Sequence, residues 1–153
     1  MESTVYYQKF DIGWLRIEAL GDAIVRIDYA DEPETSDKPA EVIKQCIDEL
    51  NEYFRGERKT FDVKIKPETY GTPFQQSVWE QLRQIPYGET ISYKVLAERI
   101  SGSNYSRAVA NANGKNPISI IIPCHRVIAS NNTVGGYTGG LDKKKLLLSV
   151  EGR

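Results

Sequence analysis

The single histidine of this chain lies directly beside one of its two cysteines, within Pro123–Val127, whose sequence is PCHRV. This segment follows an isoleucine-rich run at 118–122, which predicts a buried strand. The thiolate is the reacting form of cysteine, and a neighbouring imidazole is one of the groups that lowers a thiol pKa. The pattern therefore indicates a nucleophile. The alternative is that Cys124 is a small core residue with His125 as its satisfied polar neighbour.

Length and cysteine content narrow the class of protein. A chain of 153 residues forms one large domain or two small ones with a real core. No apolar run reaches the length of a membrane span, and the N-terminus lacks the pattern of a signal peptide. One histidine with Cys46 and Cys124 cannot supply a structural zinc cage. Cys46 falls at a helical apolar position and is expected to be a buried free thiol, which favours the reduced cytoplasm.

The net charge of −1 conceals two halves of opposite sign. Residues 1–67 contain 10 Lys and Arg against 15 Asp and Glu, whereas 68–153 contain 10 against 6. The balances are therefore −5 and +4, which sum to −1. A basic half joined to an acidic half is expected where only one half contacts a polyanion. Together with Pro67, this shift predicts two domains, 1–67 and 68–153.

The first domain is predicted to be a small antiparallel sheet with a helix. Three short runs alternate between apolar and polar residues, at 4–10, 14–20 and 23–29. The short turn segments between them are typical of hairpins. A helix is expected to begin near Asp37, with Pro39 in its first turn, and to end at Gly56. A further strand is expected at 61–65, and no chemistry is apparent in this half, which is interpreted as a scaffold.

The second domain is predicted to be mostly helical, so the fold class is α+β. Thr72 and Pro73 open one helix, a second begins near Ser92, and a third covers 105–114. The second and third are joined by a glycine-containing turn, which predicts a helix-turn-helix. A last helix opens with the lysines of 143–145, which are expected to form a solvated face.

The side chains of helix 105–114 are unusual for a DNA-reading helix. Helices that read the major groove carry long hydrogen-bonding side chains. Here Arg107 is followed by small residues, among them Ala108, Ala110 and Asn113. Small residues permit the close backbone approach that the narrower minor groove requires. The alternative is that the alanines pack inside the domain.

The stretch from Gly114 to Gly140 resembles the active-site segment of the O6-alkylguanine-DNA alkyltransferases, the suicide DNA-repair proteins. Asn116–Pro117, the PCHRV segment and the run GGYTGG at 135–140 carry the resemblance. It covers roughly 70–152, and the first half of the chain matches only in length and layout. It implies irreversible, single-turnover transfer of an alkyl group from O6-alkylguanine, and from O4-alkylthymine, to Cys124. No metal or organic cofactor is implied.

The resemblance also implies roles for individual residues. Cys124 would be the nucleophile, His125 a base acting through a bridging water, and Glu151 the carboxylate that orients the imidazole. Asn116 would be a hinge that ties the helix-turn-helix to the cysteine segment. Tyr93 would donate a hydrogen bond to the flipped base.

DNA contacts follow from the same resemblance. The protein would bind double-stranded DNA containing O6-alkylguanine through the minor groove, largely without sequence specificity, as a monomer and away from membranes. Arg107 would fill the gap left by the extruded nucleotide. The carbonyls of Cys124 and Val127 would accept from the exocyclic amine of guanine, Tyr137 would form a wall, and the Thr138 backbone N–H would donate to O6.

Three other functions fit part of the pattern. A lesion-binding alkyltransferase-like protein shares the fold but lacks the nucleophile. A cysteine hydrolase also uses Cys, His and a carboxylate, but it usually takes its His from elsewhere in the chain. A non-catalytic DNA-binding regulator would show strong sequence preference, and a hydrolase would turn over esters or peptides.

Overall fold

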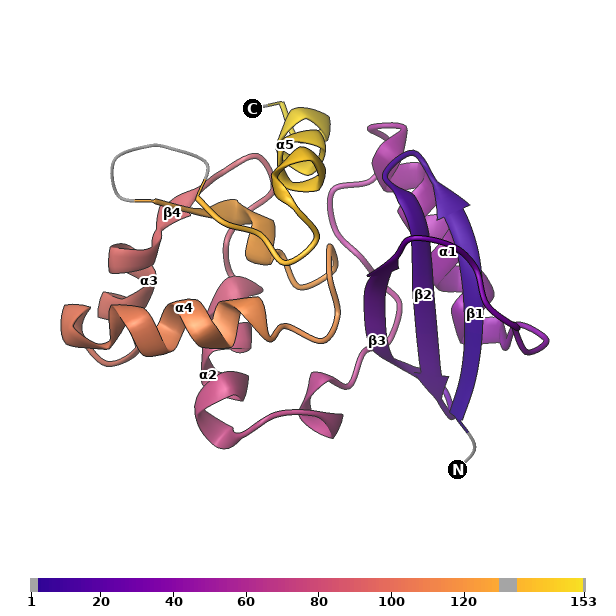
Figure 1. The fold of residues 1–153 in the computed structure, drawn as a ribbon, viewed down its shortest axis with the longest axis horizontal. Helices are drawn as coiled ribbons and strands as arrows, with labels where there is room; N and C mark the ends of the chain where they lie inside the picture. Colours follow the sequence, from indigo (N-terminus) through magenta and orange to yellow (C-terminus); the bar gives the residue numbers. More distant parts are fainter. Residues whose placement is uncertain (1–2, 130–134, 153) are drawn as a thin grey trace. The chain divides into compact units, whose positions relative to one another are not determined.

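The computed structural model describes residues 3–129 and 135–152, and Figure 1 shows their arrangement along the chain. The chain divides into two compact units. The first, here the sheet unit, comprises Met1–Tyr70 and Pro117–Ser119, and the second, the helical unit, comprises Gly71–Asn116 and Ile120–Arg153. The segment Pro117–Ser119 thus joins the sheet unit although its sequence neighbours on both sides belong to the helical unit.

The sheet unit is built on a three-stranded antiparallel sheet with the order β1-β2-β3. The strands are β1 (Ser3–Phe10), β2 (Gly13–Leu20) and β3 (Ala23–Ala30). Helix α1 (Glu41–Phe54) packs against the sheet (Figure 1) through a buried stripe that includes Ile43, Cys46 and Leu50. Spacing of three and four residues places these side chains on one face of the helix. The alternating runs in the sequence therefore correspond to this sheet.

The start of α1 differs from the expectation. The helix begins at Glu41 rather than near Asp37. Asp37 accepts a hydrogen bond at 2.9 Å from the backbone N–H of Val5, and Ser36 accepts one at 3.0 Å from that of Tyr7. Residues that resemble helix caps in the sequence thus bind the free edge of β1 instead, because an edge strand presents unpaired backbone groups.

The strand expected at 61–65 is wrong. Only Ile65 pairs with the sheet, through an isolated parallel bridge to Ile24. Just before it, the buried carboxylate of Glu49 accepts hydrogen bonds from the backbone N–H groups of Asp62 and Val63, at 2.9 and 3.1 Å. A side chain of α1 therefore satisfies backbone donors that a strand partner would otherwise take.

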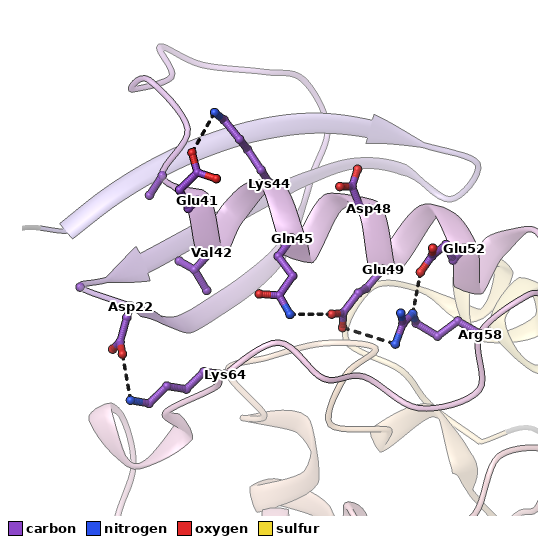
Figure 2. Close-up of a pocket in the computed structure, with 12 residues that line it drawn as sticks. Asp22, Glu41, Val42, Lys44, Gln45, Asp48, Glu49, Glu52, Arg58 and Lys64 are labelled. Carbon is purple, nitrogen blue, oxygen red and sulfur yellow. Dashed lines mark hydrogen bonds and ion pairs between the residues drawn. The ribbon is translucent and has the colours of Figure 1, made fainter.

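An open groove of about 820 Å³ runs along α1 in the sheet unit. Figure 2 shows that several of the charged side chains lining it form pairs. Asp22 pairs with Lys64 at 3.0 Å, and Glu52 pairs with Arg58 at 2.7 Å. Most of the charged groups that line the groove are therefore paired with one another, which leaves Asp48 as an exposed carboxylate without an ion pair among the described residues.

The helical unit contains four α-helices and a two-stranded parallel sheet among its described residues. The helices are α2 (Pro73–Leu82), α3 (Tyr93–Ile100), α4 (Ser106–Gly114) and α5 (Leu141–Val150), and the strands are β4 (Ile91–Ser92) and β5 (Val127–Ile128). Short 3₁₀ turns lie at η1 (Pro67–Thr69, in the sheet unit), η2 (Ser103–Tyr105) and η3 (Cys124–Arg126). None of the described helices is long and apolar enough to cross a membrane.

Local signals explain where these helices begin. Thr72 forms a capping box with Gln75 at the start of α2, and the Ser92 side chain accepts from the third residue of α3. The indole N–H of Trp79 donates to the Ala112 carbonyl at 2.8 Å, which fixes α2 against α4. Helices α3 and α4, joined through η2, form the expected helix-turn-helix.

The isoleucine-rich run at 118–122 is not a strand, contrary to expectation. Ile27 of β3 donates its backbone N–H to Pro117 and accepts from Ser119, and pairing ends there. The chain then turns at Ile120, which has φ 74°, a conformation rare for a β-branched residue. The turn delivers Cys124 on η3 rather than on an extended segment.

Candidate active site

A pocket of about 190 Å³ in the helical unit contains Cys124. Its lining comes from α3, α4, η3 and the segment before α5: Tyr93, Ala110, Asn113, Gly114, Cys124, Gly136, Tyr137 and Thr138. Six of these eight residues were predicted as site residues, all except the two glycines. Gly114 is the last residue of the helix predicted at 105–114, and Gly136 lies within the run GGYTGG at 135–140, so the same segments could have indicated both glycines.

Residue Cys124 is only 6% exposed, and its environment shifts the pKa of its thiol in two opposite directions. Burial raises the pKa of the Cys124 thiol above its ordinary value. Hydrogen bonds from the side chains of Asn116 and Tyr137, and the positive charge of Lys144, act in the opposite direction. Because burial dominates, the resting thiol is protonated at neutral pH and must lose its proton before it can attack.

His125 and Glu151 form a fully buried pair. The His125 Nε2 atom lies 2.7 Å from a carboxylate oxygen of Glu151, and neither side chain is exposed. Burial lowers the pKa of His125, although Glu151 raises it. A neutral imidazole that donates from Nε2 to Glu151 has its lone pair on Nδ1, and this atom has no hydrogen-bond partner among the described residues. The arrangement leaves one ring nitrogen able to accept a proton.

Cys124 and His125 occupy consecutive positions of the 3₁₀ turn η3. The two residues therefore lie on a turn and not at the end of a strand. The two side chains are presented by a turn, whose geometry is set by the Cys124 and Arg126 backbone N–H groups bonding to the Ile122 and Pro123 carbonyls, at 2.8 and 3.0 Å.

Arg126 anchors the carboxylate of Glu151 from the other side. Its guanidinium donates to the two Glu151 oxygens at 2.8 and 3.1 Å and to the Ile85 carbonyl at 2.7 Å. The backbone N–H of Gly88 adds a further bond to Glu151 at 3.2 Å. A buried carboxylate with this many donors is compensated for its loss of water, so Glu151 is fixed where it contacts His125.

Asn116 connects the end of α4 to the cysteine turn. Its amide donates to the Ile122 carbonyl at 2.7 Å, and its side chain also hydrogen-bonds the Cys124 thiol. At the same end of α4, the Thr138 hydroxyl donates to the Gly114 carbonyl at 3.0 Å. The segment before α5 is thereby fastened to the helix-turn-helix.

Tyr93 and Asn113 contact each other in the pocket. Burial raises the pKa of Tyr93 and the charge of Cys124 raises it further, whereas the hydrogen bond from Asn113 lowers it. The phenol therefore keeps its proton and can donate it in a hydrogen bond. The Asn113 side-chain oxygen has no partner among the described residues, although it is buried.

The remaining predicted residues lie outside the pocket lining. Arg107 and Ala108 are exposed on α4. The carbonyl of Val127, expected to face the base, already accepts a hydrogen bond at 2.6 Å from the Lys144 side chain. Lys144 itself contradicts the expectation of a solvated lysine face, because it has no exposed surface. Its spacing of three and four residues from Leu147 and Leu148 could have indicated the buried face of α5.

A helix-turn-helix combined with a buried cysteine, an imidazole and a carboxylate is consistent with a DNA-binding protein that reacts through a cysteine side chain. Comparison with family models names the family to which the chain belongs. The model for the 6-O-methylguanine DNA methyltransferase ribonuclease-like domain matches 4–67, and that for the DNA-binding domain matches 73–153. The chain belongs to the 6-O-methylguanine DNA methyltransferase family.

Individual relatives agree with this assignment. The methylated-DNA–protein-cysteine methyltransferase of Methanosarcina acetivorans is 52% identical over 112 residues, 73% of this chain and 70% of the relative. That of Mycobacterium bovis is 50% identical over 106 residues, 69% of this chain and 63% of the relative. The expected family and its class, a methyltransferase of DNA repair, are confirmed.

Solved structures confirm the α+β fold. The crystal structure of Mycobacterium tuberculosis O6-methylguanine methyltransferase superimposes with a TM-score of 0.87 at 37% identity, covering 98% of this chain and 93% of that one. That of Mycobacterium tuberculosis OGT in complex with DNA has a TM-score of 0.85 at 39% identity, with coverage of 99% and 92%.

Proposed function

We propose that this chain transfers an alkyl group from O6 of guanine in duplex DNA to the sulfur of Cys124, once per molecule. The observation that carries the proposal is the buried Cys124 in a pocket beside a neutral imidazole held by a carboxylate. This is the nucleophile, base and orienting group that covalent catalysis requires. A sulfur–carbon bond forms as the carbon–oxygen bond breaks. The product is a thioether that no step of this chemistry cleaves, and no metal or organic cofactor takes part.

The proton of the thiol leaves through His125. Burial keeps the thiol protonated at rest, so attack needs a base, and the unpartnered Nδ1 of His125 accepts the proton through a bridging water. Glu151, 2.7 Å from Nε2, stabilises the imidazolium that forms. The two electrons of the broken carbon–oxygen bond remain on the departing guanine, which takes up a proton.

Pocket residues recognise the base and help it leave. The protonated hydroxyl of Tyr93 donates to the flipped base, and the Thr138 backbone N–H donates to O6. Tyr137 forms one wall, with Ala110 and Asn113 on the α4 side. The carbonyls of Cys124 and Val127 accept from the exocyclic amine. The Val127 carbonyl has two lone pairs, so it can accept from the amine and from Lys144 at the same time. O4-alkylthymine presents a similar reacting oxygen and is a second substrate.

The helical unit binds the DNA, and the sheet unit is the scaffold. The net charge of +4 in 68–153, against −5 in 1–67, favours this division. The exposed small residues of α4, including Ala108, permit docking in the minor groove without sequence specificity, and Arg107 enters the stack as the nucleotide leaves it. The protein acts as a monomer. Cys46 and Cys124 are both free, which supports a reducing cytoplasm.

Intact mass spectrometry after incubation with duplex DNA carrying a single O6-methylguanine tests the proposal. A mass increase of one methylene is expected, mapped to Cys124 and saturating at one per protein. Unchanged mass with tight binding would instead indicate a lesion-binding protein. Unchanged mass without binding, together with turnover of an ester, would indicate a cysteine hydrolase.

Arg107→Ala is expected to weaken repair of duplex DNA by about 10- to 100-fold, because unstacking a base costs a few kcal/mol and this side chain fills the gap. Reaction with free O6-benzylguanine, which needs no flipping, is expected to change little. Rates on the two substrates provide the measurement. Arg83→Ala, which removes an exposed arginine at the end of α2, is the control. Equal losses on both substrates would contradict the flipping role.

A further inference from the structure

Lys144 of α5 is a buried lysine whose observed partners are carbonyl oxygens. It has no exposed surface, and its ammonium donates to the Val127 carbonyl at 2.6 Å and to the Gly136 carbonyl at 3.0 Å. In the described part of the chain no carboxylate forms an ion pair with it. Burying an ammonium costs several kcal/mol even after relaxation. A fold that keeps this charge beside a reactive cysteine indicates a function for it.

The ammonium lies directly behind the pocket that holds Cys124. Gly136, one of its two acceptors, lines that pocket, and so does Tyr93, whose ring centroid is 5.9 Å from the Lys144 nitrogen. A Cβ atom added to Gly135 would lie 3.6 Å from the same nitrogen. The positive charge therefore lies against two residues that line the pocket, Gly136 and Tyr93.

We propose that Lys144 is a positioning residue with an electrostatic role: its buried ammonium stabilises the ionised sulfur of Cys124 and holds the carbonyls of Val127 and Gly136 in place. The inference rests on the proposed function, because it assigns a counter-charge to the same nucleophile. When the sulfur gains its alkyl group it becomes neutral, so the stabilisation applies to the unreacted protein alone.

The groups that face Lys144 support this pairing. Burial lowers the pKa of Lys144 to about 8, and the charge of Cys124 raises it. In return, the Lys144 charge lowers the pKa of Cys124 against the effect of burial. The charge of Lys144 also lowers the pKa of His125 on η3, in the same direction as burial. The other charged groups nearby, Arg126 and Glu151, are paired with each other. The charge of each group thus favours the charged form of the other.

The first test uses Lys144→Met, which keeps the length of the side chain and removes the charge. Modification of Cys124 by iodoacetamide is followed from pH 6 to 10 by peptide mass mapping, without DNA. The pH profile is expected to move upward by about one unit, the usual effect of losing a nearby opposite charge. Modification at pH 7 then slows about tenfold. Lys145→Met, at the exposed neighbouring position, is expected to follow the wild type. Superimposed profiles for Lys144→Met and the wild type would overturn the proposal.

The second test does not depend on whether Lys144→Met folds. The side-chain carbon of Lys144 is titrated by NMR in the wild type and in Cys124→Ser. Because the coupling is mutual, the pKa of Lys144 is expected to fall when the ionisable sulfur is absent. An unchanged Lys144 pKa would refute the inference. Both tests proceed without DNA, so a wild-type protein that gains no methyl group would count against the proposed function alone.

Discussion

Cys124→Ser is expected to abolish alkyl transfer and to leave DNA binding nearly intact. A serine hydroxyl lacks the accessible ionised form and the softness of sulfur, so it cannot displace an alkyl group under the same conditions. The substitution changes one atom inside a pocket and leaves the exposed surface of α4 untouched. Intact mass after incubation with methylated duplex DNA measures transfer, and a gel-shift titration with the same DNA measures binding.

Cys46→Ala is the matched control, because Cys46 is the other thiol of the chain and is completely buried in the sheet unit. This variant is expected to acquire a methyl group in the same stoichiometry as the wild type, with some loss of stability from the cavity. Methyl uptake by Cys124→Ser would show that another residue is the acceptor, and the mechanism would fail.

Glu151→Gln is expected to lower stability and transfer together. The substitution removes the negative charge that the buried Arg126 and His125 contact, at 2.8 and 2.7 Å, and replaces one of the two acceptor oxygens with an NH₂ donor. Breaking a buried ion pair by removing one partner typically costs about 3–5 kcal/mol. In a chain of this size that lowers the melting temperature by about 10 °C or more. Thermal unfolding followed by circular dichroism provides the measurement.

Glu52→Gln is the comparison, because Glu52 also pairs with an arginine, at 2.7 Å, but is partly exposed. Exposed pairs contribute little, so this variant is expected to melt close to the wild type and to transfer normally. A melting temperature of Glu151→Gln equal to that of Glu52→Gln would mean that the buried cluster does not stabilise the fold. Normal transfer by Glu151→Gln would remove the orienting role.

Local patterns in the sequence predicted much of this molecule. Alternation identified the three strands, and capping residues such as Thr72 and Ser92 identified the starts of α2 and α3. The pocket residues Tyr93, Tyr137 and Thr138 were predicted through the family resemblance, whereas the small residues of α4 were noted from their own pattern. Glu151 was identified through the family resemblance, since nothing in its local sequence distinguishes a buried carboxylate from a solvated one.

The errors share a physical cause, which is that long-range partners decided the outcome. Asp37 has the side chain of a helix cap but bonds to β1. The run at 118–122 is apolar enough for a strand, yet pairing with β3 extends over Pro117–Ser119 alone. Lys144 is buried because carbonyls from two other segments receive its charge, and periodicity within α5 indicates the face but not these acceptors.

The excursion of Pro117–Ser119 into the sheet unit has a consequence for dissection of the protein. Helix α4 ends just before this tripeptide and Cys124 follows it, so the segment that joins them is tethered to Ile27 by two backbone hydrogen bonds. A fragment cut near Pro67 would leave Ile118, which is fully buried, facing water. The sheet unit therefore fixes the segment between α4 and Cys124, and we expect that a fragment lacking residues 1–67 would lose this restraint on the spacing between the helix and the cysteine.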